Sequence, residues 1–588
     1  MKRQRVLILG GGCGGVAAAW SLSSTPRARR RFDVTLLQSG WRLGGKGATG
    51  RDPTRGHAVL EHGLHLWLGF YRHAFSMVRD LYEHWNGPTD GPQRSLESAF
   101  TPAYDVRLRG PARAGSQQWD LEFPRLPGRP WDPSAETSWL ATSKRWLRQL
   151  PTLLGGIPKD DRATFLSLGR TVARGLAREW ARWGEHAWDR MDLEDFRAWL
   201  ARHGATPEVT DSPPVVGLYD LGFAYPRGGQ SVQEGRAAAG VAVKVLLRMF
   251  ADYRGAPLWR MSAGMGDTVF APAWDVLKTR GVNISLFHHV LGVSAERGRV
   301  SKVRVGIQAS GLENYDPLID VGSVRAWPER PIEDRLDRLA PGALDGDLSE
   351  TLAEVELRDG QDFDAVVMAI PAAAQRRCAV GLAEANPRYG AMLEACHTIP
   401  TVAAQVWMSR SAEALGSDAV PSVSTGHPGL FRTHANMTDV LEAEAWKEAP
   451  RHLAYLCGAA PPEVLAASSR EQAHARLREL AASWFRTRAP TAWPGAATAS
   501  GSFDEGALHV DPGGRRTDAV YLRANTEAWE RYVLSLPGTT GHRLAPNDSG
   551  FDNLFLAGDW TRNEINGGSV EAAVSSGMIA ARAIEAQA

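Results

Sequence analysis

Three glycines close to the N-terminus have the spacing of a phosphate-binding turn. Gly10, Gly12 and Gly15 form a GxGxxG pattern that directly follows the apolar run VLIL and opens a helical stretch. In that setting the first glycine permits a tight turn, the second lets a pyrophosphate approach the backbone, and the third lets helix and strand pack closely. The helix N-terminus adds free N–H groups and the positive end of its dipole. The pattern predicts a dinucleotide site, with a glycine turn that binds nothing as the alternative.

The position expected to hold the adenosine ribose departs from the usual pattern. An acidic side chain is expected about 20 residues after the glycines, and this chain has Gln38 there, at the end of VTLLQ. A glutamine amide oxygen can accept a hydrogen bond from a ribose hydroxyl, but it lacks the charge that strengthens such a bond. We therefore expect weaker adenosine binding, and a polar strand end that faces water is the alternative.

A second glycine-rich segment follows the next expected strand. It contains Arg42, Gly44, Gly45 and Lys46. It resembles the second glycine-rich signature of flavoproteins of the flavin amine oxidase superfamily. A guanidinium suits a pyrophosphate, and glycines let the backbone run close to a cofactor. Together with GxGxxG, the segment indicates FAD rather than NAD. Lys46 is a candidate for binding a flavin or substrate oxygen, and an ordinary surface lysine is the alternative.

The segment from 553 to 584, NLFLAGDWTRNEINGGSVEAAVSSGMIAARAI, carries the most specific resemblance. It resembles the C-terminal FAD motif of plant-type phytoene and zeta-carotene desaturases and, more broadly, of flavin amine oxidases. The resemblance implies that Gly558 and Asp559 contact the pyrophosphate and ribityl chain, and that Val570 and Glu571 lie at the isoalloxazine. A strand end followed by a helix N-terminus also suits a polar cofactor oxygen.

Two features within the resembling segments bear on the substrate. Amine oxidases usually have an aromatic residue of the substrate cage two residues before the glutamate, whereas this chain has Ser569 there, as the desaturases do. Residues 56 to 75 also resemble the desaturases, through Gly-Leu-His followed by Gly and Tyr. His65 of that segment is the candidate acid, base or substrate-orienting residue because imidazole titrates near neutral pH. A structural histidine is the alternative.

The elements that must position these residues come from both ends of the chain. Residues 5 to 45 read as strand, glycine turn, helix, polar loop (25 to 31) and strand, and the last 38 residues return to a strand and then a helix. We expect an α/β fold with a discontinuous Rossmann-like FAD-binding domain and a mixed α+β substrate domain with a helical insertion. The expected FAD-binding domain comprises 1–75, 255–305, 355–395 and 540–588, and the substrate domain comprises 76–254, 306–354 and 396–539. The residues expected to contact FAD are Gly10, Gly12, Gly14, Gly15, Gln38, Ser39, Arg42, Gly44, Gly45, Lys46, Val290, Gly558, Asp559, Gly568, Ser569, Val570, Glu571 and Ala573.

The middle of the chain alternates between helical and extended patterns. Residues 131 to 204 read as helical, with Asp192 and Asp195 as helix-start signals and Gly204 as a stop. Further expected elements are a helix ending near Gly281, a strand from 284 to 293, and strands at 363–371, 401–408 and 452–458. Residues 310 to 350 are rich in proline, glycine and acid and are expected to form an insertion or long loop.

Composition excludes several classes of protein. Lys+Arg total 67 and Asp+Glu total 66, so the chain lacks the basic footprint of a nucleic-acid binder. The apolar run before GGGCGG is too short for a signal-peptide core, and no run approaches the roughly 18 apolar residues of a membrane-spanning helix. Cys13, Cys378, Cys396 and Cys457 are scattered, which predicts reduced thiols without disulfides or a zinc site. We expect a cytoplasmic protein whose membrane contact, if any, is peripheral.

Tryptophans and arginines gather in the expected helical insertion. Trp131, Trp139, Trp146, Trp180, Trp183, Trp188 and Trp199 lie in this region. They could line a channel for a long apolar substrate or lie at a membrane interface. Arg170, Arg174, Arg178 and Arg182 recur every fourth residue and would form one basic stripe on a helix. Docking on anionic lipid and a solvated helix face are the two interpretations of that stripe.

These observations favour an FAD-dependent desaturase, dehydrogenase or isomerase that acts on a long apolar polyene, terpenoid or lipid-like molecule by hydride transfer to the flavin. Because no second dinucleotide fingerprint is visible in the sequence, electrons are expected to leave to a quinone or to oxygen. The alternatives are a flavin-dependent amine or amino-acid oxidase and a protein that keeps FAD without redox chemistry.

Overall fold

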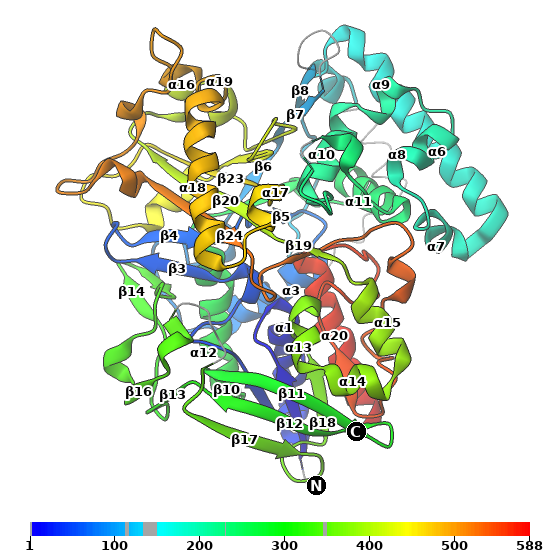
Figure 1. Cartoon of the computed structure of the whole chain (residues 1–588), viewed down its shortest axis with the longest axis vertical. Coiled ribbons are helices and arrows are strands. Elements are labelled where there is room, and N and C mark those ends of the chain that lie inside the picture. The colour runs from blue at the N-terminus through cyan, green and yellow to red at the C-terminus, as the bar shows by residue number, and fades with distance from the viewer. Residues whose placement is uncertain (1–2, 112–116, 133–149, 230, 345–349) are drawn as a thin grey trace.

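A computed structural model describes residues 3–111, 117–132, 150–229, 231–344 and 350–588. At its base lies a five-stranded sheet in the order β10-β2-β1-β18-β26 (Figure 1). These strands are β1 Gln4–Leu9, β2 Phe32–Leu37, β10 Asn283–Ser285, β18 Ala365–Met368 and β26 Leu554–Leu556. Every pairing in the sheet is parallel. The sheet therefore joins segments from both ends of the chain and from its middle, which confirms the discontinuous Rossmann-like fold.

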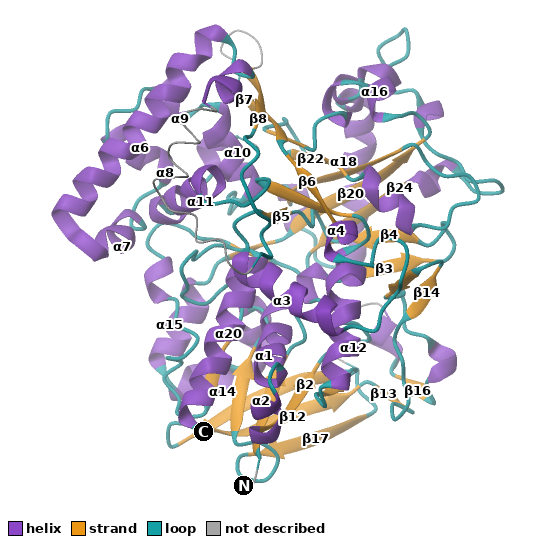
Figure 2. Ribbon diagram, turned by 180° about the vertical axis from the view of Figure 1, so that it is seen from behind, coloured by secondary structure: helices purple, strands orange, loops and turns teal. Residues whose placement is uncertain are grey.

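Helices and a second sheet cover the two faces of the parallel sheet. The helices α1 (Cys13–Ser23), α3 (Arg72–His84), α12 (Ala271–Thr279) and α20 (Val570–Gln587) pack on the face that carries Val6 and Ile8. Leu7 and Leu9 face the other way, into a second core shared with the antiparallel sheet β11 (His288–Glu296), β12 (Arg299–Ile307) and β17 (Ala353–Arg358). Burial on both faces explains why these strands are continuously apolar rather than alternating. Figure 2 shows α1 and α20 side by side.

A seven-stranded sheet forms the upper part of the molecule, in the order β24-β20-β23-β22-β21-β7-β8. Its strands are β7 Asp105–Gly110, β8 Gln117–Glu122, β20 Thr401–Met408, β21 Val423–Thr425, β22 Thr433–Asn436, β23 His452–Ala459 and β24 Val520–Asn525. All pairings are antiparallel except that of β21 with β7. The helix α18 (Arg470–Thr487) packs against this sheet through Leu477 and Trp484. The strands expected at 401–408 and 452–458 are thereby confirmed.

The helical insertion forms a lobe at the upper right of Figure 1. It contains α6 Arg162–Trp183, α7 Ala187–Met191, α8 Phe196–Arg202, α9 Pro207–Thr210, α10 Pro213–Leu221 and α11 Ala239–Ala251. The Asp195 carboxylate accepts a hydrogen bond from the Arg197 N–H at the start of α8, and Gly204 follows that helix with φ +92°. This confirms the start and stop signals of that helix. Trp139 and Trp146 lie outside the described residues.

Three local expectations differ from the structure. The predicted loop 25–31 contains the helix α2 (Pro26–Arg31), because Thr25 accepts a hydrogen bond from the Ala28 N–H and Pro26 suits the first turn. The single strand expected at 284–293 is divided into β10 and β11, which belong to different sheets, because Phe287 takes a left-handed φ of 59° between them. The expected long loop at 310–350 contains the short hairpin β14 (Ile319–Val321) with β15 (Val324–Ala326).

Short elements connect these layers. The strands are β3 Thr49–Asp52, β4 Ala58–Glu61, β5 Trp67–Leu68, β6 Phe100–Ala103, β9 Leu258–Met261, β13 Ala309–Ser310, β16 Arg338–Leu339, β19 Thr398–Ile399 and β25 Tyr532–Val533. The helices are α4 Leu96–Ala99, α13 Ala372–Cys378, α14 Val380–Ala385, α15 Pro387–Ala395, α16 Ala412–Leu415, α17 Pro462–Leu465 and α19 Ala489–Ala492. Among the described helices, none has both the length and the apolar character that crossing a bilayer requires.

Candidate active site

One large cavity lies between the parallel sheet, the seven-stranded sheet and the helical lobe. Its volume is about 1440 Å³, which exceeds the range of about 300–1,000 Å³ typical of pockets for one small ligand. Residues from both ends of the chain line it, together with residues of β11, α10 and α11. The cavity therefore has room for a dinucleotide and a second molecule beside it.

The glycine turn between β1 and α1 lines one end of this cavity and is shaped for a close approach. A Cβ atom on Gly12 would meet nothing nearer than the Gly44 carbonyl oxygen at 3.8 Å, so the space in front of this glycine is open. A Cβ on Gly15, by contrast, would lie 1.9 Å from the Gly10 carbonyl oxygen. Because α1 begins without a side-chain cap, its first N–H groups are suited to a phosphate. The turn therefore fits the pyrophosphate of a dinucleotide.

Gln38 occupies the expected place beside the glycine turn, but its amide is engaged with the backbone. Its Oε1 accepts a hydrogen bond of 2.7 Å from the Gly11 N–H, and its Nε2 donates to the Ser39 carbonyl oxygen at 2.5 Å. Both Gln38 and Ser39 line the cavity, as Val290 does. In this arrangement Gln38 stabilises the turn. Its amide oxygen has a second lone pair that could still accept a hydrogen bond from a ribose hydroxyl.

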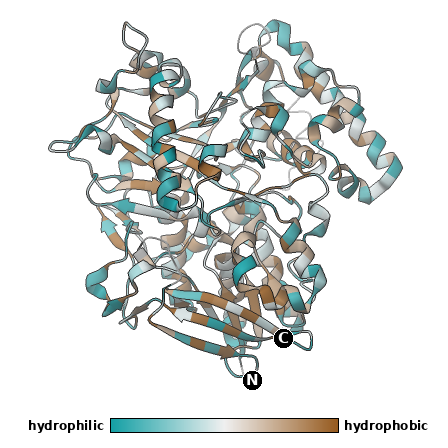
Figure 3. Cartoon of the chain, in the orientation of Figure 1, coloured by the Kyte–Doolittle hydropathy of each residue, from teal (hydrophilic) through white to brown (hydrophobic). Residues whose placement is uncertain are grey.

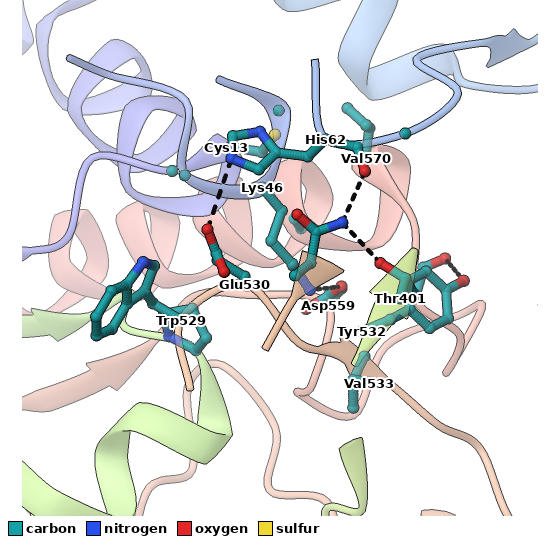
Figure 4. A pocket seen from close by; sticks show the side chains of 18 of the residues that line it. Cys13, Lys46, His62, Thr401, Trp529, Glu530, Tyr532, Val533, Asp559 and Val570 are labelled. Carbon is teal, nitrogen blue, oxygen red and sulfur yellow. Dashed lines mark hydrogen bonds and ion pairs between the residues drawn. The ribbon is translucent and has the colours of Figure 1, made fainter. Parts of the chain in front are cut away.

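The segment after β2 adds two positive charges to the cavity wall. Burial, together with the nearby charge of Arg523, lowers the pKa of Arg42 to about 10, so this guanidinium stays positive at neutral pH. The Gly44 N–H donates to the Gly11 carbonyl oxygen at 2.9 Å, which ties this segment to the glycine turn. Lys46 reaches across the cavity to Asp559, with 2.7 Å between Nζ and Oδ2 (Figure 4). Lys46 therefore lies in the site rather than on an open surface.

The C-terminal segment meets the glycine turn at its far side. A Cβ on Gly14 would lie 3.0 Å from the Gly558 nitrogen, so the ends of β26 and α1 are in contact. Ser569 caps α20 by accepting a hydrogen bond of 3.2 Å from the Ala572 N–H. Cavity-lining residues from this segment are Gly558, Asp559, Gly568, Ser569, Val570 and Ala573.

Two of the residues expected to contact FAD do not line the cavity. Gly15 faces the Gly10 carbonyl oxygen, so its place is in the packing of α1 on β1. The Glu571 carboxylate points to the start of α3, where it accepts hydrogen bonds of 2.9 Å from the N–H groups of His73 and Ala74. Glu571 thus caps α3, which lies beside α20 in the structure, and its side chain is directed away from the cavity.

His65 lies on the cavity wall and is held by two acceptors. Its Nδ1 lies 2.8 Å from Glu61 Oε1, and its Nε2 lies 3.2 Å from the Lys46 carbonyl oxygen. Burial alone would lower the pKa of His65, but the Glu61 carboxylate and these hydrogen bonds outweigh burial and raise it. The Glu61 carboxylate beside Nδ1 and the Lys46 carbonyl beside Nε2 favour the form of the ring in which both nitrogens carry protons. A doubly protonated ring has no lone pair with which to take a proton from a substrate.

We expect the stability contributed by His65 to depend on pH in one direction. A histidine whose folded pKa is raised stabilises fully below its unfolded pKa of about 6.5, and the contribution is lost as pH rises through the folded pKa. The melting-temperature difference between wild type and His65→Gln should therefore be largest near about pH 6 and shrink towards about pH 9. Differential scanning fluorimetry of the two proteins measures this. A difference that stays constant across the range would show that the ring is not charged.

Several polar residues of the cavity wall carry no sequence signal. Arg523 forms an ion pair with Glu530, and the Asn525 amide donates hydrogen bonds of 2.8 Å to the His62 carbonyl oxygen and 2.9 Å to Thr401 Oγ1. Figure 4 shows His62 facing Glu530 in this wall. These residues lie on or beside β24, a strand without a motif, and only the folding of the seven-stranded sheet brings them to the cavity.

Family comparisons agree with this geometry. Residues 8–81 match the model of the NAD(P)-binding Rossmann-like domain, and residues 345–585 match that of the flavin containing amine oxidoreductases. No curated protein matches the chain.

Solved structures share the fold. An oxidoreductase from Methanosarcina mazei is 14% identical with a TM-score of 0.52, over 98% of this chain and 99% of that one. Putrescine oxidase bound to putrescine is 14% identical with a TM-score of 0.53, over 100% of this chain and 99% of that one. Cyclohexylamine oxidase from Brevibacterium oxydans is 14% identical with a TM-score of 0.50, over 100% of both chains. With the open cradle at Gly12, the Rossmann-like match over residues 8–81 and the match to the flavin containing amine oxidoreductases over residues 345–585, the chain is an FAD-dependent oxidoreductase.

Proposed function

We propose that this oxidoreductase acts on a long apolar molecule of the polyene, terpenoid or lipid class, either dehydrogenating it and passing the electrons to a quinone or to oxygen, or isomerising it without net electron transfer. The observation that supports this most is the apolar composition of the cavity beyond the cofactor segments. That part is lined by Leu64, Leu66, Leu68, Phe70, Val106, Leu218, Leu221, Phe223, Val241, Val245, Met249 and Leu258. Such a wall binds a substrate through the apolar area that is removed from water.

FAD, when bound, supplies the acceptor for a hydride from the substrate. The residues of the chain position the substrate and exclude water from it. Ser569 lines the cavity beside Tyr71, so the place of a cage aromatic holds a small polar side chain that leaves room for a chain-like substrate. When protonated, His65 orients the substrate or cofactor as a positive charge, because its two ring nitrogens then face the Glu61 carboxylate and the Lys46 carbonyl oxygen.

A specific contact favours amine oxidation as the second candidate. Tyr532 and Phe223 both line the cavity, with ring centroids 5.0 Å apart in an edge-to-face arrangement. Aromatic faces attract an ammonium group through their quadrupoles, and the Lys46 ammonium already lies 5.8 Å from the centroid of the Tyr532 ring. A substrate amine is therefore the competitor to test against a polyene.

Anaerobic reduction of the bound flavin distinguishes the two candidates. The purified yellow protein is mixed without oxygen with a polyene in mixed micelles, or with a panel of primary and secondary amines. We expect the flavin absorbance to bleach with the polyene and to stay unchanged with the amines. Bleaching by an amine, with hydrogen peroxide released once air is admitted, would replace the proposal with the second candidate. No bleaching by either class would leave FAD without the proposed redox role.

The helical lobe suggests how an apolar substrate arrives, and we propose that this lobe contacts anionic lipid. Arg170, Arg174, Arg178 and Arg182 are all exposed on α6, where Trp180 is also 48% exposed. Figure 3 shows hydrophilic and hydrophobic residues alternating along this helix. The inner helices α10 and α11 contribute Leu218 and Val241 to the cavity, so the lobe separates the cavity from this outer face.

The same bleaching assay tests this contact with lipid when the polyene is supplied in phospholipid vesicles. We expect faster bleaching when the vesicles contain anionic phospholipid than when they are zwitterionic, because basic side chains are attracted to an anionic surface by about 1 kcal/mol each. Neutralising the four α6 arginines to glutamine should abolish the difference. A matched control neutralises Arg27, Arg476, Arg486 and Arg515, which are exposed elsewhere. Equal loss in both variants would refute docking through α6.

A further inference from the structure

The loop that follows β2 lies against the start of β11, at the wall of the cavity. The Gln38 N–H donates to the Ser285 carbonyl oxygen at 2.9 Å, and the Gln38 carbonyl oxygen accepts from the His288 N–H at 2.9 Å. The Phe287 N–H donates to the Gly40 carbonyl oxygen at 2.8 Å. In a dinucleotide-binding fold the acidic residue that follows this loop's strand lies at the adenosine ribose. The first residues of β11 are therefore fixed beside the place of that ribose.

The His289 ring is held against this loop through one of its two nitrogens. Its Nδ1 lies 3.0 Å from Ser39 Oγ. Ser39 Oγ also donates to Gln308 Oε1 at 3.4 Å, and the same Oε1 accepts a hydrogen bond of 3.0 Å from the Gly40 N–H. Gln308 is fully buried, so it fixes the loop and with it the hydroxyl that the ring contacts.

The second ring nitrogen of His289 is open to the cavity. Nε2 has no hydrogen-bond partner among the described residues and is not enclosed by protein atoms, and both His289 and Ser39 line the cavity. A neutral imidazole has one donor and one acceptor nitrogen, and a ribose hydroxyl can both donate and accept. Nε2 can therefore bind such a hydroxyl whichever ring nitrogen carries the proton.

Gln38 offers a ribose little at the place where an acidic residue is usual. Its amide is engaged with the Gly11 N–H and the Ser39 carbonyl oxygen, so one lone pair of Oε1 is left, whereas a carboxylate has about four acceptor sites. A buried hydroxyl without a partner carries a free-energy cost. The ribose therefore needs a further polar group beside Gln38, and His289 presents one.

We propose that His289, oriented by Ser39, binds the 2′-hydroxyl of the adenosine ribose of FAD. A histidine of β11 thus makes the hydrogen bond that an acidic residue after the second strand makes in the usual dinucleotide fingerprint. Ser39 and His289 are 250 positions apart along the chain, so the spacing of the N-terminal motif gives no sign of this partner. The assignment concerns the cofactor and holds for either candidate substrate.

The affinities for FAD and for an FAD analogue that contains 2′-deoxyadenosine test the proposal. The flavin-loaded protein, before and after exchange of FAD for the analogue, is diluted, and the released flavin is separated by ultrafiltration and measured by its fluorescence. We expect wild type to bind the analogue about 5-fold more weakly than FAD, which is the effect of one neutral hydrogen bond. Wild type that binds both flavins equally would overturn the proposal without any variant.

Variants assign the hydrogen bond to the ring. His289→Phe should bind FAD about 5-fold more weakly than wild type does, and it should no longer distinguish FAD from the analogue. His289→Gln, which restores a polar group, should distinguish the two flavins again in part. A histidine with a purely structural role would weaken the binding of both flavins equally and leave the ratio of their affinities unchanged.

His288→Phe is the matched control. His288 precedes His289 on β11, so its side chain points in the other direction, and its Nδ1 lies 2.7 Å from the Leu286 carbonyl oxygen. This variant should keep both the FAD affinity and the ratio of wild type. A ratio that persists in His289→Phe would assign the hydroxyl to Gln38 instead. A ratio lost equally in His288→Phe would attribute the effect to distortion of the strand, and either result refutes the role given to His289.

Discussion

Replacing Gly15 with alanine is expected to give a protein that purifies without flavin and melts at a lower temperature than wild type. The new methyl group would lie 1.9 Å from the Gly10 carbonyl oxygen, so α1 must move away from β1. Overpacking of a well-packed site costs typically about 1–3 kcal/mol, and here the atom that must yield is backbone. The movement also displaces the N–H groups that face the pyrophosphate. Absorbance of the purified protein and its melting temperature measure the two effects.

Gly12→Ala is the matched control for this prediction. Its methyl group meets no protein atom closer than 3.8 Å, so the stability of the flavin-free protein should match that of flavin-free wild type. The methyl group does occupy the side from which the pyrophosphate approaches, so flavin affinity should fall. Yellow Gly15→Ala protein with the wild-type melting temperature would contradict the packing role given to this glycine.

Breaking the ion pair between Arg51 and Asp267 is expected to lower the free energy of unfolding substantially. Both side chains are fully buried, and Arg51 Nη2 lies 2.6 Å from Asp267 Oδ2. Arg51 also donates to the carbonyl oxygens of His57 and Ala443. Arg51→Met leaves the carboxylate buried without its counter-charge, which typically destabilises a protein by about 3–5 kcal/mol. Chemical denaturation followed by tryptophan fluorescence measures the loss.

The pH dependence of this variant separates charge from packing. Burial raises the pKa of Asp267 even with Arg51 present, and loss of the guanidinium must raise it further. A carboxyl whose folded pKa lies above its unfolded value makes the folded state more stable as pH falls. The deficit of Arg51→Met should therefore shrink with decreasing pH. The double variant Arg51→Met, Asp267→Leu should recover much of the stability. A loss of stability that neither lower pH nor the second substitution reduces would indicate lost packing instead.

The parts of the fold that the sequence predicts are those with a local cause. GxGxxG between an apolar strand and a helix, the Asp195 cap with Gly204, and the apolar strands at 401–408 and 452–458 all depend on neighbouring residues. The division of the strand at 284–293 depends on the left-handed φ of Phe287, and a phenylalanine gives no sign of that conformation. The helix at Pro26–Arg31 lies within the expected polar loop, because its residues are mostly polar and carry no apolar period.

The candidate site divides in the same way. Residues placed by a motif, such as Gly12, Arg42 and Asp559, do line the cavity. Glu571 belongs to a motif, but its side chain points towards α3. Successive residues of a helix point in different directions, so Glu571 faces away from the cavity that its neighbour Val570 lines. Arg523 and Asn525 reach the cavity through a strand pairing between residues more than a hundred positions apart. No spacing within one segment can reveal such partners.

The order of the strands in the parallel sheet has a consequence for biosynthesis. β1 ends at Leu9 and its sheet is completed by β26, which begins at Leu554. At about 5–20 residues per second, the ribosome needs roughly half a minute to two minutes to make the chain between them. During that time the glycine turn exists without the Gly558–Asp559 segment that faces it. Flavin capture must therefore follow the emergence of the last helix, and the nascent chain depends on other contacts to protect its apolar first strand until then.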